Sequence, residues 1–353
     1  MERSITTSAF PFLVYIIITG NMMKNNSFVS SHSLNAPILF LVFNRPTTTK
    51  KVFEEIKRAK PPRLYIAADG PRKYKAGESE KVKQVREHII NNIDWECEVK
   101  TLFREQNLGC KYAVSGAIDW FFENEEMGII LEDDCLPNQS FFWFCEELLE
   151  KYKDNEQIGM ITGTNYMTNC NLRMPGTYFY SNYFAIWGWA SWRRAWLNYD
   201  VEMKIYSTLN PNQLRYKCPN YLFYLYLKRT FDLIKHGDVD TWDIQWFYHC
   251  FMNSRLCITP TQNLISNIGV DGAHASGQAT DNHFIDKHEF LDVLQHKPIS
   301  QMFMPYSEYD MKLFNEKLKP ALYRGIALSL ASDFLKKVKL NKTIRQLRGI
   351  HED

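Results

Sequence analysis

Three consecutive acids, Glu132, Asp133 and Asp134, directly follow the apolar run at 127–131. Like charges so close together repel one another and resist removal from water, so a cation is expected beside them. Mn²⁺ or Mg²⁺ suits the site, because it binds through one or two carboxylates together with substrate phosphates. Along an extended segment Glu132 and Asp134 would share one face while Asp133 points away. The alternative is a solvated loop that caps the next helix, but the position after an apolar run favours the metal.

A second acid, Asp243, stands between two tryptophans in the segment WDIQW and follows a polar loop at 236–240. Thr241 is expected to cap a helix there, which puts Asp243 in the first turn, where the helix dipole favours a negative charge. A carboxylate beside Trp242 and Trp246 could act as general base toward a sugar hydroxyl. The alternative is an acid that only starts a helix, with both tryptophans in the core.

Two further segments could complete a binding site. The glycine-bearing loop at 267–274 ends in His274, and such loops bring backbone N–H groups and an imidazole near phosphate. A surface turn with a solvated His274 would leave the same pattern. The aromatic stretch at 183–192 includes Trp187 and Trp189, whose ring faces could form the floor of a sugar pocket. Core packing is the competing explanation for both rings.

The elements that would position these side chains alternate along the first half of the chain. Apolar runs at 38–43, 64–68, 97–103 and 127–131 are separated by helical patterns after 47, at 81–90 and at 111–122. Continuous apolar runs of this kind predict an α/β fold with a mostly parallel central sheet and helices on both faces. Ligands of such sheets bind at the carboxyl ends of the strands, which is where Asn44, Arg45, Asp69 and the three acids fall. Beyond 163 the alternation stops, and we expect that part to cover the site.

Composition excludes several classes of protein. The chain has 353 residues, of which 45% are hydrophobic and 23% charged, as in folded globular proteins. A formal net charge of +2 gives no overall basic field, so no nucleic-acid partner is expected. The eight cysteines lack metal-binding spacing and indicate reduced thiols in the cytoplasm.

The two ends of the chain differ from the middle. The apolar stretch at 10–20 is too short to span a bilayer and lacks the basic flank of a signal peptide. We therefore expect the natural translation start at Met22 or Met23. Residues 1–36 are expected to be a poorly ordered extension. The segment 301–353 is predicted to be a helical basic tail, and its part at 321–353 holds seven basic and three acidic residues. That tail would bind an anionic membrane surface, on the inner face of the cell membrane, or pack against the domain as a solvated helix.

Together the motifs resemble the GT-A class of nucleotide-sugar glycosyltransferases. Their order over about 37–277 is similar to that in N-acetylglucosaminyltransferase I and its bacterial family 2-like relatives. The segment LEDDCLPNQSFF resembles the acidic metal signature of that family, which implies that Asp134 holds the metal. By the same resemblance the donor is contacted by residues of several segments: Asn44 and Arg45 in FNRP at the nucleotide, Asp69 in AADGP at the uracil edge, Lys111 near the diphosphate, and Glu132 and Asp133 at the donor sugar and ribose.

The segment WDIQW resembles the family segment that supplies the catalytic base, which implies that role for Asp243, with Trp242 at the donor. Ile244 and Gln245 replace the second acid often found there, so the acceptor contacts depart from the pattern. The loop NIGVDGAHASG resembles one that folds over the donor phosphates and contains His274. The implied catalytic domain covers 37–300, with a nucleotide-binding half at 37–135 and a second half for donor sugar and acceptor at 136–300.

The activity implied by the resemblance is a metal-dependent, inverting transfer of a sugar. The donor would be a nucleotide-diphosphate sugar, expected to be a UDP-sugar, and the acceptor a glycan or lipid-linked hydroxyl, as in the biosynthesis of cell-surface polysaccharides. Two alternatives are a sugar-phosphate nucleotidyltransferase and a non-catalytic carbohydrate-binding protein. The first is disfavoured because its basic glycine-rich loop is missing after 38–43, and the second because both acidic motifs are present.

Overall fold

The computed structural model describes residues 28, 30, 32–167, 176–269 and 296–327. His274, the apolar stretch at 10–20 and the tail beyond 327 lie outside the described residues. The expectations about those segments therefore stay predictions.

The first half of the chain alternates strands and helices as predicted. Its strands are β1 (Ile38–Val42), β2 (Arg63–Ala68), β3 (Glu98–Phe103) and β4 (Met127–Glu132), and its helices are α1 (Pro46–Ala59), α2 (Glu78–Asn91) and α3 (Gly109–Asn124). β1 pairs in parallel with β2 and with β4, and β2 pairs in parallel with β3. β1 is buried along its whole length, as expected for a strand covered on both faces.

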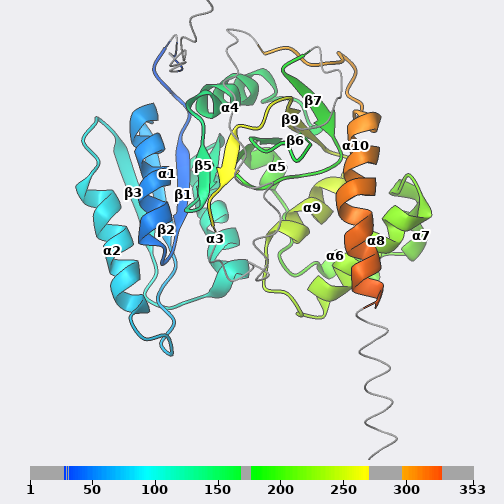
Figure 1. The fold of residues 1–353 in the computed structure, drawn as a ribbon, viewed down its shortest axis with the longest axis horizontal. Coiled ribbons are helices and arrows are strands. Elements are labelled where there is room, and N and C mark those ends of the chain that lie inside the picture. The colour runs from blue at the N-terminus through cyan, green and yellow to red at the C-terminus, as the bar shows by residue number, and fades with distance from the viewer. Residues whose placement is uncertain (1–27, 29, 31, 168–175, 270–295, 328–353) are drawn as a thin grey trace, which may run out of the picture.

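The handedness of these connections places the helices on opposite faces of the sheet. α1 and α2 link strands that step outward from β1 to β3, whereas α3 returns across β1 to β4. Because crossovers between parallel strands are right-handed, α3 must lie on the face opposite to α1 and α2 (Figure 1). The strand order therefore reverses between β1 and β4, which is the position where open α/β sheets bind ligands.

The second half extends the same sheet with strands of both directions. The full order is β3-β2-β1-β4-β8-β6-β9-β7, in which β8 and β7 run opposite to the rest. A separate two-stranded sheet joins β5 to β10. The strands of this half are β5 (Cys135–Pro137), β6 (Ile158–Thr162), β7 (Tyr178–Ser181), β8 (Trp189–Trp192), β9 (Leu256–Pro260) and β10 (Ile265–Asn267).

Helices cover this half as well. α4 (Gln139–Lys151) contacts α1, and α5 (Arg193–Trp196) contacts α3, so both faces of the sheet are covered. The others are α6 (Lys204–Thr208), α7 (Pro211–Lys217), α8 (Tyr221–Lys235), α9 (Asp243–Met252), α10 (Ser307–Leu313) and the π-helical turn η2 (Phe314–Leu318). The predicted α/β fold, with a mostly parallel sheet between helices, is confirmed.

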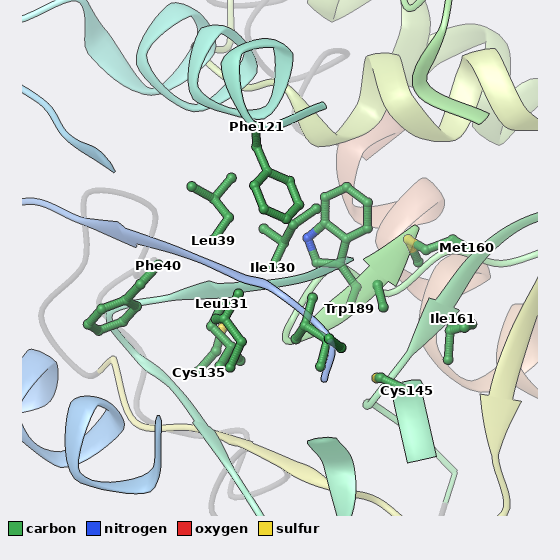
Figure 2. Packing of buried hydrophobic residues seen from close by; sticks show 14 of the residues in the cluster. Leu39, Phe40, Phe121, Ile130, Leu131, Cys135, Cys145, Met160, Ile161 and Trp189 are labelled. Atoms are coloured by element: carbon green, nitrogen blue, oxygen red, sulfur yellow. The ribbon is translucent and has the colours of Figure 1, made fainter. Parts of the chain in front are cut away.

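The core follows from the alternation of side chains along the central strands. Figure 2 shows Leu39, Ile130 and Trp189 on one side of the sheet with Phe121 of α3. Phe40 and Leu131, the next residues along β1 and β4, point to the other side. Trp189, Leu39, Phe121 and Ile130 are fully buried. Seven cysteines fall in the described part of the chain and all are free thiols, as predicted.

No described helix is both long enough and apolar enough to cross a membrane.

Candidate functional site

The acid triplet Glu132–Asp134 lies at the carboxyl end of β4, beside the carboxyl end of β1. Arg45, which follows β1, donates from Nη1 to Asp133 at 2.9 Å and to Asp134 at 2.5 Å. Asp133 also accepts the backbone N–H of Phe43 at 3.3 Å. The residues predicted from two distant motifs therefore meet at the point where the strand order reverses.

The expected extended run through the acids is wrong. β4 ends at Glu132, and Asp133 and Asp134 form a turn before β5. Because of that turn Asp133 does not point away: both carboxylates reach the same guanidinium nitrogen of Arg45. Gly269 closes over the turn, since a Cβ at that position would stand 2.3 Å from an Asp134 oxygen.

Burial and mutual repulsion shape the electrostatics of the triplet. Burial, with the charges of Asp134, Asp133 and Asp243, raises the pKa of Glu132 to about 8. Burial also raises the pKa of Asp133 to about 7, although Arg45 opposes the shift. Oε1 of Glu132 is buried and forms no hydrogen bond with a described group. With all three carboxyl groups ionised, the cluster would hold more negative charge than one arginine neutralises. A bound cation would favour that ionised form and would satisfy the unpartnered oxygen.

No group of three His, Cys, Asp or Glu side chains within the described ranges is arranged to hold a metal ion. A divalent ion bound here would have to take one or two carboxylates from the protein and its other oxygens from phosphate and water, which is a common arrangement for Mg²⁺. Asp134 is partly exposed, whereas Asp133 is buried. The donor set therefore fits a metal shared with a bound phosphate group, with Asp134 as the accessible ligand.

Asp243 begins α9 and lies within electrostatic reach of Glu132, whose pKa it helps to raise. Thr241 does not cap the helix as expected, because Trp242 holds the cap position. The Thr241 hydroxyl donates instead to the Asp243 carboxylate. Cys110, at the start of α3, is within electrostatic reach of both acidic motifs: burial and the charges of Glu132, Asp240 and Asp243 raise the pKa of its thiol to about 12. Asp243 and the acid triplet thus converge on one region.

A cavity of about 350 Å³ opens beside Asp243. Its volume is within the range of small-ligand sites. Rings dominate its wall, and residues of α8, α9, β10, α10 and η2 enclose it. Its lining includes Tyr166, Tyr183, Trp187, Tyr226, Phe247, Asn267, Leu313, Lys317 and Leu318. Asn267 connects the cavity to the acid triplet, because its side chain accepts the N–H of Gly269.

The tryptophans expected in a sugar pocket divide into two groups. Trp187 is partly exposed and lines the cavity, with Tyr166 packed edge-on at 5.4 Å between ring centroids. Trp189 is fully buried and stacks on Trp242 at 5.6 Å. Trp189 therefore belongs to the core and supports the site from behind, which corrects its expected place in the pocket wall. Trp242 is also buried, at 2% exposure, so its ring has little surface to offer a donor.

Three other predicted nucleotide contacts already have protein partners. Asp69 accepts N–H groups from Gly70, Leu108 and Gly109 and the side-chain amide of Asn107, which ties the end of β2 to the start of α3. Burial raises its pKa while these donors oppose the shift. Lys111 donates to Glu202 at 2.9 Å. Asn44 donates to Glu78 at 2.7 Å. Their roles toward a nucleotide stay predictions.

Asp240 is a site residue that the sequence interpretation passed over. Its carboxylate accepts the backbone N–H groups of Cys110 and Lys111 at 3.1 and 3.0 Å and so caps α3 from a loop 130 positions away. A Cβ on Gly109 would stand 2.9 Å from this carboxylate. The one signal in the sequence is that Asp240 lies two residues before WDIQW. Residue spacing does not predict that a side chain will cap a helix 130 positions away.

Comparison with known proteins gives distant likenesses only. No protein-family profile matches this sequence, and no curated protein matches it significantly. Among solved structures, similar folds include the glycosyltransferase GlyE of Streptococcus pneumoniae (TM-score 0.31, 10% identity, 64% of this chain and 45% of that one). Mouse xyloside xylosyltransferase 1 gives a TM-score of 0.31 at 11% identity, over 62% of this chain and 81% of that one.

A UDP-glucose pyrophosphorylase complexed with UDP-glucose is similar over 43% of this chain and 64% of its own, with a TM-score of 0.25 and 12% identity. The chain thus spans less than two thirds of both GlyE and this pyrophosphorylase. At these TM-scores the likenesses assign no function.

Proposed function

We propose that this protein is a GT-A-type glycosyltransferase that moves a sugar from a nucleotide-diphosphate donor, expected to be a UDP-sugar, to a hydroxyl of a glycan or lipid-linked acceptor. The observation that carries the proposal is the convergence of two acidic motifs. Glu132 ends β4, Asp133 and Asp134 form the turn after it, and Asp243 begins α9. The charges of Asp133, Asp134 and Asp243 all act on Glu132.

The two motifs suit different tasks. Asp134 is the accessible carboxylate at the point where the sheet binds ligands, so it would hold Mn²⁺ or Mg²⁺ together with the donor phosphates. Bound there, the ion would stabilise the charge that develops on the departing nucleotide diphosphate. Arg45 stands beside both Asp133 and Asp134 and would offer its remaining N–H groups to the same phosphates.

Asp243 would act as general base. It is half-buried, its Oδ1 accepts one hydroxyl from Thr241, and it lines a cavity wide enough for an acceptor sugar. Deprotonation of the acceptor hydroxyl by Asp243 would let that oxygen attack the anomeric carbon from the face opposite the leaving diphosphate, which inverts the configuration. The ring faces of Trp187 and Tyr166 would pack against the sugar C–H groups and hold the hydroxyl toward Asp243.

The test is an activity screen with the full chain. Purified protein is incubated with radiolabelled UDP-sugars and Mn²⁺, and release of UDP and of labelled sugar is measured with and without EDTA. Metal-dependent transfer or donor hydrolysis supports the proposal. Release of pyrophosphate from a nucleoside triphosphate and a sugar 1-phosphate would identify a nucleotidyltransferase instead, and inactivity in both assays with no UDP binding would contradict both activities.

A further inference from the structure

The cavity beside Asp243 has a charged side chain at each of two places on its wall. Within the described part of the chain its lining includes one carboxylate, that of Asp243 on α9, and one ammonium group, that of Lys317 on η2. The remaining lining residues are rings, aliphatic side chains and uncharged polar groups. The cavity is therefore polarised, and the two charges come from elements about 70 residues apart along the chain.

The helix that carries Lys317 is held firmly against the rest of the domain. Asp310 accepts from the Ser181 hydroxyl at 2.6 Å and from the backbone and side chain of Asn182, both at 3.0 Å. Phe314 packs edge-on against Phe223 of α8 at 5.5 Å. Because these contacts precede Lys317 by a few residues, they fix the backbone from which its side chain extends.

The π-helical turn sets the direction of the side chains that reach the cavity. In a regular α-helix successive residues turn by about 100°, so Leu313 and Leu318 would point about 140° apart. The wider turn at Phe314–Leu318 lowers that rotation, and Leu313, Lys317 and Leu318 all line the cavity. π-Helical turns are often found at functional sites. Here the turn brings the ammonium group of Lys317 to the wall between Leu313 and Leu318.

Lys317 has no anionic partner in the described ranges, although two nearby lysines do. Lys312 pairs with Glu316 at 4.0 Å, and Lys228 of the adjacent α8 pairs with Asp232 at 2.6 Å. Lys317 is only partly exposed and shares the cavity wall with Leu313, Leu318 and aromatic rings. In such surroundings the effective dielectric constant is below that of water, so an anion brought into the cavity would gain more from this ammonium group than from a surface lysine.

We propose that the cavity binds an acidic sugar, and that Lys317 selects it by pairing with its carboxylate or phosphate group. The inference rests on the proposed function, since it makes the acidic sugar the acceptor. The two charges of the wall would orient the ring, with the anionic substituent toward Lys317 and a hydroxyl toward Asp243. Trp187 and Tyr166 would contact its faces. Lys317 is thus a residue that determines acceptor specificity and takes no part in the chemical step.

Binding of matched sugars to the full-length protein tests this inference. Methyl β-glucuronide and glucose 6-phosphate are compared with neutral methyl β-glucoside, by ligand-observed NMR titration at low and high salt. At low salt the wild type should bind at least one acidic sugar about fivefold or more tightly than the neutral one, and high salt should narrow the difference. The two acidic probes distinguish a carboxylate from a phosphate as the preferred group.

Variants of the helix show whether Lys317 causes the preference. Lys317→Met should reduce the preference to less than about twofold while Lys317→Arg keeps it, and Lys312→Met is the matched control on the same helix. Overturning results are a wild type that binds no probe, a wild type without preference, or a preference that survives in Lys317→Met. The assay needs no donor and no turnover, so a failed activity screen with an intact sugar preference would count against the transferase proposal alone.

Discussion

The acidic side chains at the strand ends of the first half and Asp243 in the second half have different surroundings. At the strand ends of the first half the side chains are bound to other parts of the protein. Asp69 holds four donors, Glu78 is bound by Arg72 and Asn44, and Asp133 is bound by Arg45 and Phe43. In the second half Asp243 accepts one hydrogen bond from the residues that the structure describes, from the Thr241 hydroxyl, and it lines a cavity.

Under the proposed function, this difference would correspond to a division of work between donor and acceptor. A region whose side chains are fixed by several partners keeps one geometry, which suits a donor nucleotide that is the same in every turnover. A region of rings around an open space can change its specificity through a few side chains. Substitutions in the first half should therefore affect the nucleotide, and substitutions in the second half should affect the acceptor or the transfer step.

The largest effect is expected from Asp243→Asn. The amide keeps the shape of the side chain but cannot accept the proton of an acceptor hydroxyl, so transfer should fall on the order of 10²-fold or more. UDP binding should stay unchanged, because Asp243 belongs to the second half. The measurement is UDP release from the donor found in the activity screen, with UDP affinity determined by calorimetry.

Asp238→Asn is the control for that substitution. Asp238 lies in the exposed loop before α9, a few residues from Asp243, and should leave the rate unchanged. Transfer at the parent rate by Asp243→Asn would refute its assignment as base, and a loss of UDP binding would refute the division between the halves.

Asp134→Asn should have the next largest effect. The loss of a charged ligand should weaken UDP binding in Mn²⁺ about 100-fold and leave the weak binding in EDTA unchanged. Calorimetric titration of UDP with and without Mn²⁺ measures this. Glu105→Gln, an exposed change in the same half, is the control. Equal affinities of variant and wild type in Mn²⁺ would show that Asp134 holds no metal.

The comparison of halves also marks what the sequence could predict. The strands β1 to β4 and the helices between them came from local patterns, because apolar runs and helical spacing each use neighbouring residues. The same patterns located the acid triplet and Arg45 at strand ends. The meeting of these residues required only the rule that ligands bind at the carboxyl ends of parallel strands.

Other features depend on contacts between distant residues. WASW is a short apolar run, and nothing local indicates that β8 pairs antiparallel with β4 or that Trp189 is buried. The turn at Asp133 and the cap that Asp240 provides to α3 are likewise products of tertiary structure. Lys317 carries no motif, and its place on the cavity wall depends on a π-helical turn and on Asp310.

A smaller effect, on stability, is expected from Gly188→Ala just before β8. Gly188 has a positive φ of 61°, and a Cβ there would stand 2.4 Å from the Ile265 side chain. Both backbone strain and crowding should lower the free energy of unfolding, by about 3 kcal/mol together. Gly237→Ala is the matched control, since its φ is 79° with open space around it. It should cost only about 1 kcal/mol.

Urea denaturation of the wild type and the two glycine variants measures the free energy of unfolding of each. Equal decreases in Gly188→Ala and Gly237→Ala would show that the side chains between β8 and β10 are loosely packed. The second half would then differ from the first half in its side-chain packing as well as in the hydrogen bonds of its acidic groups.

The smallest effect is a pH dependence of stability in the helix that closes the cavity. Burial raises the pKa of Asp310 from its ordinary 3.8 to about 6, although Ser181 and Asn182 donate to it. The folded state therefore binds this proton more tightly than the unfolded state does. The stability that this group contributes is complete below about pH 4 and is lost as pH rises through about 6.

Asp310→Asn removes that proton equilibrium. Between pH 4 and 6 the free energy of unfolding of the wild type should fall relative to the variant by about 1 kcal/mol for each pH unit. Urea denaturation of both proteins at several pH values provides the measurement, with the exposed Glu316→Gln on the same helix as control. Parallel pH profiles for wild type and Asp310→Asn would mean that Asp310 is ionised without cost. The contrast between the halves would then be confined to the wall around Asp243.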